Sequence, residues 1–476
     1  MIGRLRQTLG ARRGAGSDGG SADGGSATAD YGKTASFLAI GVGLTGVITY
    51  VYFFIASHVL SKGDYGQITV LWSAVFITIS TLYRPVEQLL SRHIAEHTVK
   101  GEPIGGTTRN AALIQFGLSL TFAVLALALR SPIQDGVLEG NETLYWVFFG
   151  AVLFYAASYF ARGFLAGSQR FGLFTALILS ESCFRTVFAV LVAVSILSGQ
   201  SAVAVGIVAA PALSLIVVPF AFARRARSAS PQPKKKESSE ESSVSMAKGG
   251  GFAAAVFVIM FSEQAFLNAG PLVIRGLQGA AAAGFIFNVL MIARAPLQLF
   301  QAVSTSILPH LTRLHTSGTE EGEREFHSSV RMVLLGLVAF TAVAFLFMAV
   351  AGPKAMQLAF SNKFTYDREG LLLVTLGMGL YLASVTVNQA CIAQGQVRRV
   401  ALRWIVCAAL FIGWNFVPLV SNEYRRVEFG FLLAAGVLFS LLYYVYRHPH
   451  ERAEDVPGPG SPEELEAQLA MIDENV

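Results

Sequence analysis

Polar residues interrupt the chain at intervals that leave long apolar segments between them. At a rise of about 1.5 Å per residue, each segment is long enough to cross a hydrocarbon layer of roughly 30 Å. Lipid offers no hydrogen-bond partners to the backbone, so such segments must be helices. The pattern therefore predicts an all-α polytopic membrane protein with twelve spans, at approximately residues 35–57, 66–90, 108–129, 143–166, 171–197, 201–223, 251–274, 283–308, 330–351, 369–393, 400–420 and 428–446.

Composition supports this prediction and restricts the partners. Of the 476 residues, 53% are hydrophobic and only 14% are charged, whereas soluble domains carry about 25% charged residues. The net charge of +5 does not indicate nucleic-acid binding, because the lysines and arginines fall mainly in the tails and in short loops. Basic residues in such positions set membrane orientation. Their asymmetry predicts that both termini are cytoplasmic.

One long polar loop divides the predicted spans into two sets of six. The loop 224–250 is rich in Arg, Ser, Lys and Glu, a composition typical of a solvated linker. It separates an N-terminal bundle, 34–223, from a C-terminal bundle, 251–447. We expect residues 1–33, rich in Gly and Ser, to be a disordered cytoplasmic tail, and residues 448–476 to be a second cytoplasmic tail.

The two halves carry traces of an internal repeat. Because each half holds an even number of spans, both halves enter the membrane from the same side. A parallel repeat about an axis along the membrane normal follows, and two facing six-helix bundles are a transporter architecture. The matching positions are Tyr65-Gly66 with Ala283-Gly284, His97-Thr98 with His315-Thr316, and Gly167 and Arg170 with Gly395 and Arg398.

Charged residues within the second predicted span form the stretch Arg84-Pro85-Val86-Glu87. Arg84 lies about 27 Å along this helix, near the cytoplasmic interface. Glu87 lies three positions on, on the same helix face, and Pro85 removes a backbone donor. These residues are predicted to be an ion pair at a kink, and a candidate inner gate.

A deeper group of polar residues lies in the first two spans of the second half. Arg294 and Glu263 are both predicted near mid-membrane, where an ionisable group costs at least about 2.5 kcal/mol and needs a partner or a wet cavity. They could pair with each other across neighbouring helices. We favour a cavity-lining role for Arg294, together with the nearby Asn268, Gln298 and Gln301.

Two further arginines lie within apolar segments of the first half. Glu181 and Arg185 are four residues apart, a spacing that predicts a pair on one helix face. Arg162 lies at the inner end of its span, where it is expected to reach the interface. No nucleophile with a base and no metal-ligand spacing is present, so we expect no enzyme activity, no metal and no cofactor.

The sequence around the first two spans resembles bacterial polysaccharide-export flippases (Wzx-type) of the multidrug/oligosaccharidyl-lipid/polysaccharide (MOP) superfamily. The resemblance covers roughly residues 34–447. It rests on a joint between the first two helices, made by Leu60, Gly63, Tyr65 and Gly66, and on a joint after the fourth helix, made by Gly167, Arg170 and Phe171.

The resemblance implies a V-shaped, MATE-like pair of bundles in the bacterial plasma membrane. Such a protein flips a polyprenyl-diphosphate-linked oligosaccharide to the outer leaflet by alternating access. Glycosyltransferases and a polysaccharide polymerase are implied partners. Arg294 and Arg84, followed by Arg185, would bind the diphosphate, and Glu87, Glu181 and Glu263 would pair with arginines or line the cavity.

Three alternatives remain open on sequence alone. A cation-coupled multidrug antiporter of the same superfamily would use an acid such as Glu263, but the first span has no carboxylate. A lipid II flippase would usually have fourteen spans. A membrane scaffold of a cell-envelope machine is a non-transport alternative, suggested only by the charged loop and tails.

Overall fold

Every regular element that can be described in this chain is a helix. The computed structural model describes residues 23–100, 103–219, 241–294 and 320–449. Ten of its helices are long and apolar enough to cross a membrane. Two more are apolar but do not qualify: Ala280–Arg294 is short, and α15 (Val397–Trp414) carries three arginines among 18 residues. The all-α membrane fold is thus confirmed, whereas the count of twelve spans stays a prediction.

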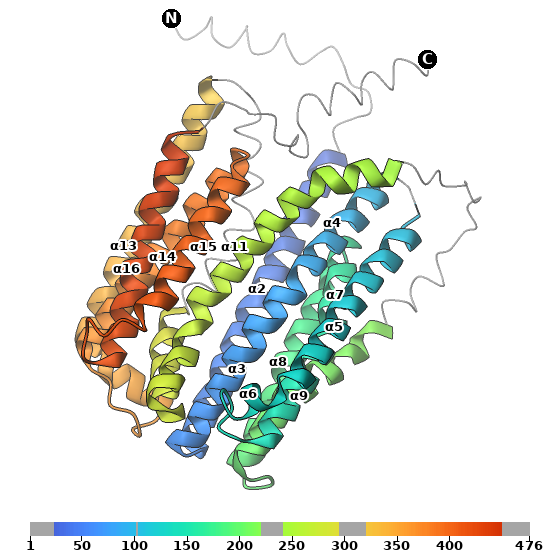
Figure 1. Cartoon of the computed structure of the whole chain (residues 1–476). Helices are drawn as coiled ribbons and strands as arrows, with labels where there is room; N and C mark the ends of the chain where they lie inside the picture. The colour runs from blue at the N-terminus through green and yellow to red at the C-terminus, as the bar shows by residue number, and fades with distance from the viewer. Residues whose placement is uncertain (1–22, 101–102, 220–240, 295–319, 450–476) are drawn as a thin grey trace, which may run out of the picture.

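The first half of the chain forms one helical bundle (Figure 1). Within it α7 is central and packs against α4, α5 and α9, while α8 packs against α2 and α9. Its elements are α2 (Asp23–Val59), α3 (Lys62–Leu82), α4 (Arg84–Lys100), α5 (Gly105–Ala128), α6 (Arg130–Gln134), α7 (Glu142–Gly167), α8 (Phe171–Ala193), α9 (Gly199–Ser214) and the 3-10 turn η1 (Leu215–Val217).

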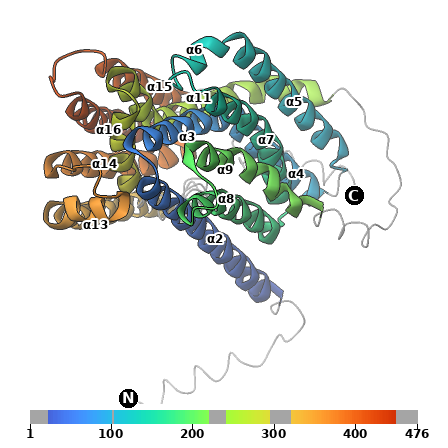
Figure 2. The ribbon, with the colours of Figure 1, turned by 90° about the horizontal axis from the view of Figure 1, so that it is seen from below.

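The second half forms the other bundle, which lies beside the first (Figure 2). Its first helix, α11, packs against α15 of its own bundle and also along α3 of the N-terminal bundle. This helix therefore provides much of the interface between the halves. The elements are α11 (Glu241–Gln278), the helix Ala280–Arg294, α13 (Glu320–Phe360), α14 (Arg368–Ala393), α15 and α16 (Glu423–Arg447).

Two helices begin earlier than the sequence predicted. α2 starts at Asp23, within the expected tail, and α11 starts at Glu241, within the expected linker. Once a helix is nucleated, each added residue gains one backbone hydrogen bond, so the membrane-spanning part favours extension of the helix into polar flanks. Helical structure thus begins before residues 34 and 251, whereas the division of the chain into tails, bundles and linker stays a prediction.

The second span is interrupted where Pro85 lies. α3 ends at Leu82, Tyr83 is a turn residue, and α4 begins at Arg84. Proline has no N–H to donate, so Pro85 cannot bond the carbonyl four residues earlier. The N–H of Glu87 then donates to the Tyr83 carbonyl at 2.9 Å, and the helix resumes. The predicted kink is confirmed as a break that leaves Arg84 at the first position of a new helix.

The repeat is visible in the ends of α7 and α14, both of 26 residues. The side chain of Asn141 caps α7 and that of Asp367 caps α14, each accepting from the N–H three residues on. After the helices, Gln169 and Gly395 both adopt positive φ, the usual conformation at a helix C-terminus. Along the chain, Asn141 and Asp367 are separated by the same number of residues as Gln169 and Gly395. Gly167 and Gly395, which the sequence analysis aligned, are two residues further apart. The predicted alignment of the second joint was therefore wrong, because Gln169 and not Gly167 corresponds to Gly395.

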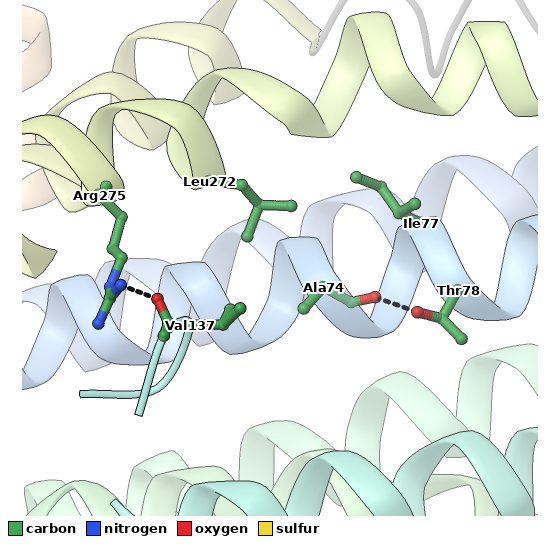
Figure 3. Close-up of a pocket in the computed structure, with 8 residues that line it drawn as sticks. Ala74, Ile77, Thr78, Val137, Leu272 and Arg275 are labelled. Carbon is green, nitrogen blue, oxygen red and sulfur yellow. Dashed lines mark hydrogen bonds between the residues drawn. The ribbon is translucent and has the colours of Figure 1, made fainter. Parts of the chain in front are cut away.

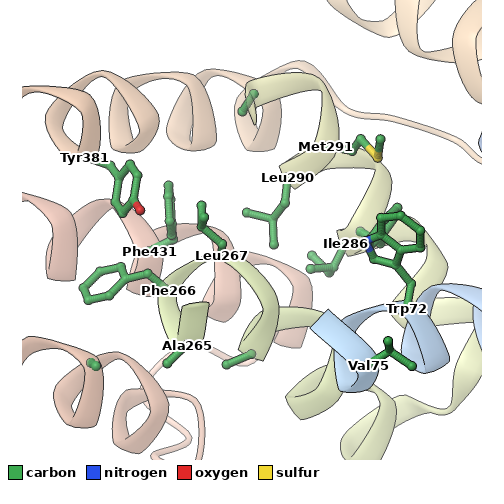
Figure 4. Close-up of a cluster of buried hydrophobic side chains, with 14 of the residues drawn as sticks. Trp72, Val75, Ala265, Phe266, Leu267, Ile286, Leu290, Met291, Tyr381 and Phe431 are labelled. Carbon is green, nitrogen blue, oxygen red and sulfur yellow. The ribbon is translucent and has the colours of Figure 1, made fainter. Parts of the chain in front are cut away.

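Aromatic packing holds the C-terminal bundle together (Figure 4). The ring of Phe266 on α11 lies within 6.1 Å of the rings of Tyr381, Trp404 and Phe411. All four side chains are at most 1% exposed. Lipid tails are as apolar as these residues, so association depends on close packing rather than on removal of water. This packed cluster holds α11 against α14, and these two helices carry Glu263 and Tyr381, which belong to the candidate site described below.

Candidate functional site

Three charged groups from both bundles gather around the buried residue Tyr381 of α14. Arg84 comes from the start of α4, Glu263 from α11, and Arg294 from the last described residue of the helix Ala280–Arg294. All three lie within electrostatic range of the Tyr381 hydroxyl. The break at Tyr83 matters here, because it sets the direction in which α4 presents Arg84. We call Arg84, Glu263, Arg294 and Tyr381 the central cluster.

Arg294 has unsatisfied hydrogen-bonding capacity. Its Nη1 donates to Asn268 Oδ1 at 3.2 Å, and its Cζ lies 6.0 Å from the ring centroid of Phe287. Its Nε and Nη2 are buried and have no hydrogen-bond partner. Guanidinium keeps its charge in proteins, so this group is a buried cation with donors to spare. Such an arrangement fits an anionic ligand.

A polar chain on α11 orients Arg294. Gln264 Oε1 accepts from Asn268 Nδ2 at 3.1 Å, and Asn268 Oδ1 then accepts from Arg294. Gln264 and Asn268 are four residues apart, on one helix face. The sequence placed Asn268 beside Arg294 correctly, but it gave Gln264 no role. An amide in this position orients the guanidinium without neutralising it.

The predicted pair between Arg294 and Glu263 does not form in the described part of the chain, where no ion pair within 4 Å includes either residue. The predicted ion pair between Arg84 and Glu87 was wrong as well, since these two described side chains do not approach within 4 Å. Arg84 feels the charges of Glu263 and Glu87 only at longer range. Glu87 in turn interacts with Arg162. Glu263 and Glu87 thus both act on Arg84, and Glu87 also acts on Arg162, so these carboxylates do not form separate one-to-one pairs with arginines.

Glu181 pairs with Arg162 and not with Arg185. The Arg162 Nη2 to Glu181 Oε2 distance is 2.5 Å, and both side chains are largely buried. Tyr155 donates to Glu181 Oε1 at 2.8 Å and Ser158 donates to Oε2 at 3.3 Å. The predicted pair on α8 was wrong because Glu181 faces α7, which offers three donors at once. The expectation that Arg162 reaches the interface was wrong for the same reason.

Arg185 stacks on aromatic rings instead of pairing with an acid. Its Cζ lies 4.5 Å from the centroid of Trp72 and 5.8 Å from that of Tyr52. Its hydrogen bonds, to Tyr155, Thr49 and Ser182, are all 3.2 Å or longer. The residue is 2% exposed and its Nε has no partner. Arg185 is therefore held inside the N-terminal bundle, away from the central cluster.

Arg162 is the residue that sequence reasoning undervalued. A signal was present: Tyr155, Ser158 and Arg162 recur at spacings of three and four, which places them on one face of α7. With Arg162 included, the charged side chains that the sequence located within these spans are four arginines and three glutamates. The count favours positive charge by one, where the sequence predicted an even balance.

Two residues predicted for the site cannot be placed, and a cavity in the described chain lies away from the central cluster. Gln298 and Gln301 fall outside the described residues. A cavity of about 250 Å³ lies between α3, α11 and the loop before α7, and includes Ala74, Leu272 and Arg275 (Figure 3). No residue of the central cluster lines it. Within the described ranges, no group of three or more His, Cys, Asp or Glu side chains could hold a metal ion.

The fold belongs to a known architectural class. The chain is similar to a multidrug resistance MATE family transporter of the MOP superfamily in an inward-facing conformation, with a TM-score of 0.61 and 12% identity, over 86% of this chain and 97% of that one. The sequence matches no protein-family model and no curated protein. At this identity the likeness establishes the MATE fold alone.

Two other solved structures extend the comparison. One is a MOP superfamily transporter from Pyrococcus furiosus, described as having a binding pocket of reversed polarity (TM-score 0.60, 14% identity, 87% of this chain and 95% of that one). Another is a eukaryotic MATE transporter (TM-score 0.58, 15% identity, 87% and 94%). This protein is therefore a multi-pass membrane protein with the fold of MOP transporters.

Proposed function

We propose that this protein flips a lipid-linked oligosaccharide, attached through a diphosphate, between the leaflets of the bacterial plasma membrane. The observation that carries the proposal is Arg294, a partly buried residue whose nitrogens Nε and Nη2 are themselves buried and have no hydrogen-bond partner in the described chain. An unpaired buried cation costs several kcal/mol, and diphosphate oxygens would supply both the charge and the acceptors. Arginine binds such oxygens in two parallel hydrogen bonds.

The surroundings of Arg294 support transfer of an anion rather than its permanent binding. Its partner, Asn268, is an amide and leaves its charge available. The carboxylate of Glu263 acts on the same Tyr381 hydroxyl as Arg294 does. This carboxylate can therefore compete with a bound anion for the positive charge of Arg294. Arg294 makes one hydrogen bond to a described residue, Asn268, so its guanidinium can release a bound anion and turn to a neighbouring carboxylate when the bundles move. This favours alternating access. The proposal keeps the orientation expected from the basic residues, with both termini in the cytoplasm.

A transport assay tests the proposal. The purified protein would be reconstituted in liposomes with a fluorescent polyprenyl-diphosphate disaccharide, and its movement between leaflets would be followed by quenching from outside. We expect Arg294→Gln to reduce the flipping rate at least tenfold, since a charge-assisted hydrogen bond is worth about 1.5–3 kcal/mol. Arg109→Gln, on the exposed face of α5, is the matched control and should transport normally.

The result also separates substrate classes. Equal rates for the Arg294→Gln and Arg109→Gln proteins, at equal reconstitution, would rule out diphosphate recognition by Arg294. No transport of the fluorescent lipid by the unaltered protein would point to another substrate. Loss of surface polysaccharide in cells that lack the protein, restored by the intact chain only, would connect the flipping to glycan export by glycosyltransferases and a polymerase.

The second candidate function is a cation-coupled multidrug antiporter, favoured by the position of Glu263. This carboxylate lies on α11 in the central cluster, and in the described part of the chain no cation lies within 4 Å of it. A proton or sodium ion could bind there. Cation-dependent drug efflux that is abolished by Glu263→Gln and unaffected by Arg294→Gln would establish this function instead.

A further inference from the structure

Several polar contacts between the bundles lie at one end of the molecule, and two groups of them centre on a charged side chain. The first group centres on Lys363, in the loop between α13 and α14. The Nζ of Lys363 donates to the carbonyl oxygens of Leu60 at 2.6 Å, His58 at 2.8 Å and Ser57 at 3.4 Å. These carbonyls belong to the C-terminus of α2 in the other bundle. We name this group the Lys363 clasp.

The Lys363 clasp satisfies a general need of helix ends. The last carbonyls of a helix have no partner within the helix and carry partial negative charge. A lysine ammonium provides three donors, and here each of them meets one carbonyl. A C-terminal bundle residue thus caps an N-terminal bundle helix. When the bundles separate at this end, three charge-assisted hydrogen bonds must break.

The second group centres on Glu139, in the loop between α6 and α7. Its Oε1 accepts from the backbone N–H of Ala280 at 3.0 Å, at the start of the helix Ala280–Arg294. The Nε of Arg275 on α11 lies 3.8 Å from the same oxygen, and its guanidinium donates to the carbonyls of Gly136 and Asp135. Figure 3 shows Arg275 beside Val137 of this loop. We name this group the Glu139 clasp.

The two clasps occupy repeat-related places. The loop before α7 and the loop before α14 end in the equivalent caps Asn141 and Asp367. Each loop reaches across to the turn that follows the first helix of the opposite bundle. Their chemistry is reversed: Lys363 brings a cation to helix carbonyls, whereas Glu139 brings an anion to a helix N–H. The same junction is therefore closed twice, by independent contacts.

Buried hydrogen bonds complete the junction between the clasps. Tyr65 of α3 donates to Asn288 Oδ1, and Asn288 Nδ2 donates to the hydroxyl of Tyr366 at 2.8 Å. Burial raises the pKa of Tyr366 above its ordinary value, so this hydroxyl keeps its proton. Tyr65 and Asn288 are fully buried, and Tyr366 is 5% exposed.

We propose that the Lys363 and Glu139 clasps hold this end of the two bundles shut, and that both must release before the protein can open there. The two clasps act independently, so the loss of each shifts the population of closed and open molecules by its own factor. Neither clasp touches the central cluster. The proposal therefore does not depend on the identity of the substrate.

The test measures the distance between the bundles at this end. Spin labels at Ile196, in the turn after α8, and at Leu419, in the turn after α15, report on opposite bundles, and both positions are exposed. Cys183, Cys391 and Cys407 are replaced by Ala in this background. Pulsed electron paramagnetic resonance then gives the populations of the short and long distances.

We expect Lys363→Met to raise the ratio of long to short distances about tenfold, the effect of losing one net charge-assisted hydrogen-bond contribution. Glu139→Gln should raise the ratio separately, and the two changes together should multiply. The matched controls are Lys354→Met, on the exposed side of α13, and Glu142→Gln, whose partner Arg130 belongs to the same bundle.

The outcomes are distinct. Lys363→Arg, which keeps a cationic donor, should retain the short distance, so a folding defect in Lys363→Met can be recognised. An unchanged distance distribution in both Lys363→Met and Glu139→Gln would overturn the proposal. So would an equal shift in Lys354→Met, because that lysine makes no contact across the interface in the described chain.

Discussion

A Cβ atom placed on Gly284 would lie 3.2 Å from the Cα of Gly66. These two glycines occupy equivalent positions of the internal repeat, and they meet where the bundles touch. Gly66 is closer still to its neighbour Ala280, whose carbonyl oxygen would lie 1.8 Å from a Cβ at position 66. Both repeats have a glycine at this position because the bundles touch there. Only a residue without a side chain lets the backbone of α3 approach that of the helix Ala280–Arg294 so closely.

Replacement of Gly66 by Ala should therefore damage the interface. The added methyl group meets backbone atoms of Ala280, which cannot rotate away, and overpacking of this kind costs about 1–3 kcal/mol or more. Thermal unfolding of the detergent-solubilised protein would show a lower midpoint. Gly63→Ala, on the same helix, is the control, since its nearest neighbour would be 4.0 Å away. Equal midpoints for both variants would contradict the close approach.

Replacement of Asn268 by Asp should weaken binding of the proposed diphosphate substrate. The new carboxylate would take the place of the amide that now accepts from Arg294, and would neutralise the guanidinium. We expect the apparent affinity in the liposome assay to fall at least tenfold, with the maximal rate less affected. Asn268→Ala removes the amide without adding charge and should have the smaller effect. Stronger impairment in the Ala variant would assign Asn268 a direct binding role instead.

The buried pair of Arg162 and Glu181 should contribute strongly to stability. Removing one partner of a buried pair costs about 3–5 kcal/mol, because the other charge stays behind in a low-dielectric interior. Glu181→Gln should lower the unfolding midpoint clearly, and a double-mutant cycle with Arg162→Met should show coupling above about 1.5 kcal/mol. The exposed pair Arg130 and Glu142, at 2.7 Å, is the control and should show almost none. A weak coupling for the buried pair would indicate that water enters between α7 and α8.

Much of the architecture followed from the hydrophobic pattern. Long apolar runs can only be helices in lipid, so the all-α membrane fold was predictable without any relative. The kink at Pro85 was predictable as well, because the lack of a backbone donor acts locally. The spacing from Tyr65-Gly66 to Ala283-Gly284 located a true repeat, and α3 and the helix Ala280–Arg294 begin at equivalent positions.

Pairing of the charges was not predictable in the same way. Glu181 and Arg185 share one face of α8 by sequence spacing, yet Glu181 bonds to Arg162 of α7. Arg294 and Arg84 were both predicted to bind the diphosphate, but they are not repeat equivalents, since the repeat aligns Arg294 with Phe76. Local spacing says which residues share a helix face. It does not say which neighbouring helix that face meets.

By itself, then, the sequence determined the class of protein: its apolar segments must be helices that cross the membrane, and its buried charges must find partners or a ligand. Only the tertiary structure decided which partners they find. It placed Arg294 with two unsatisfied donors beside Asn268, and Lys363 against the end of a helix from the other bundle. The physical reason is that hydropathy acts on each segment alone, whereas a hydrogen bond depends on the position of two helices relative to each other.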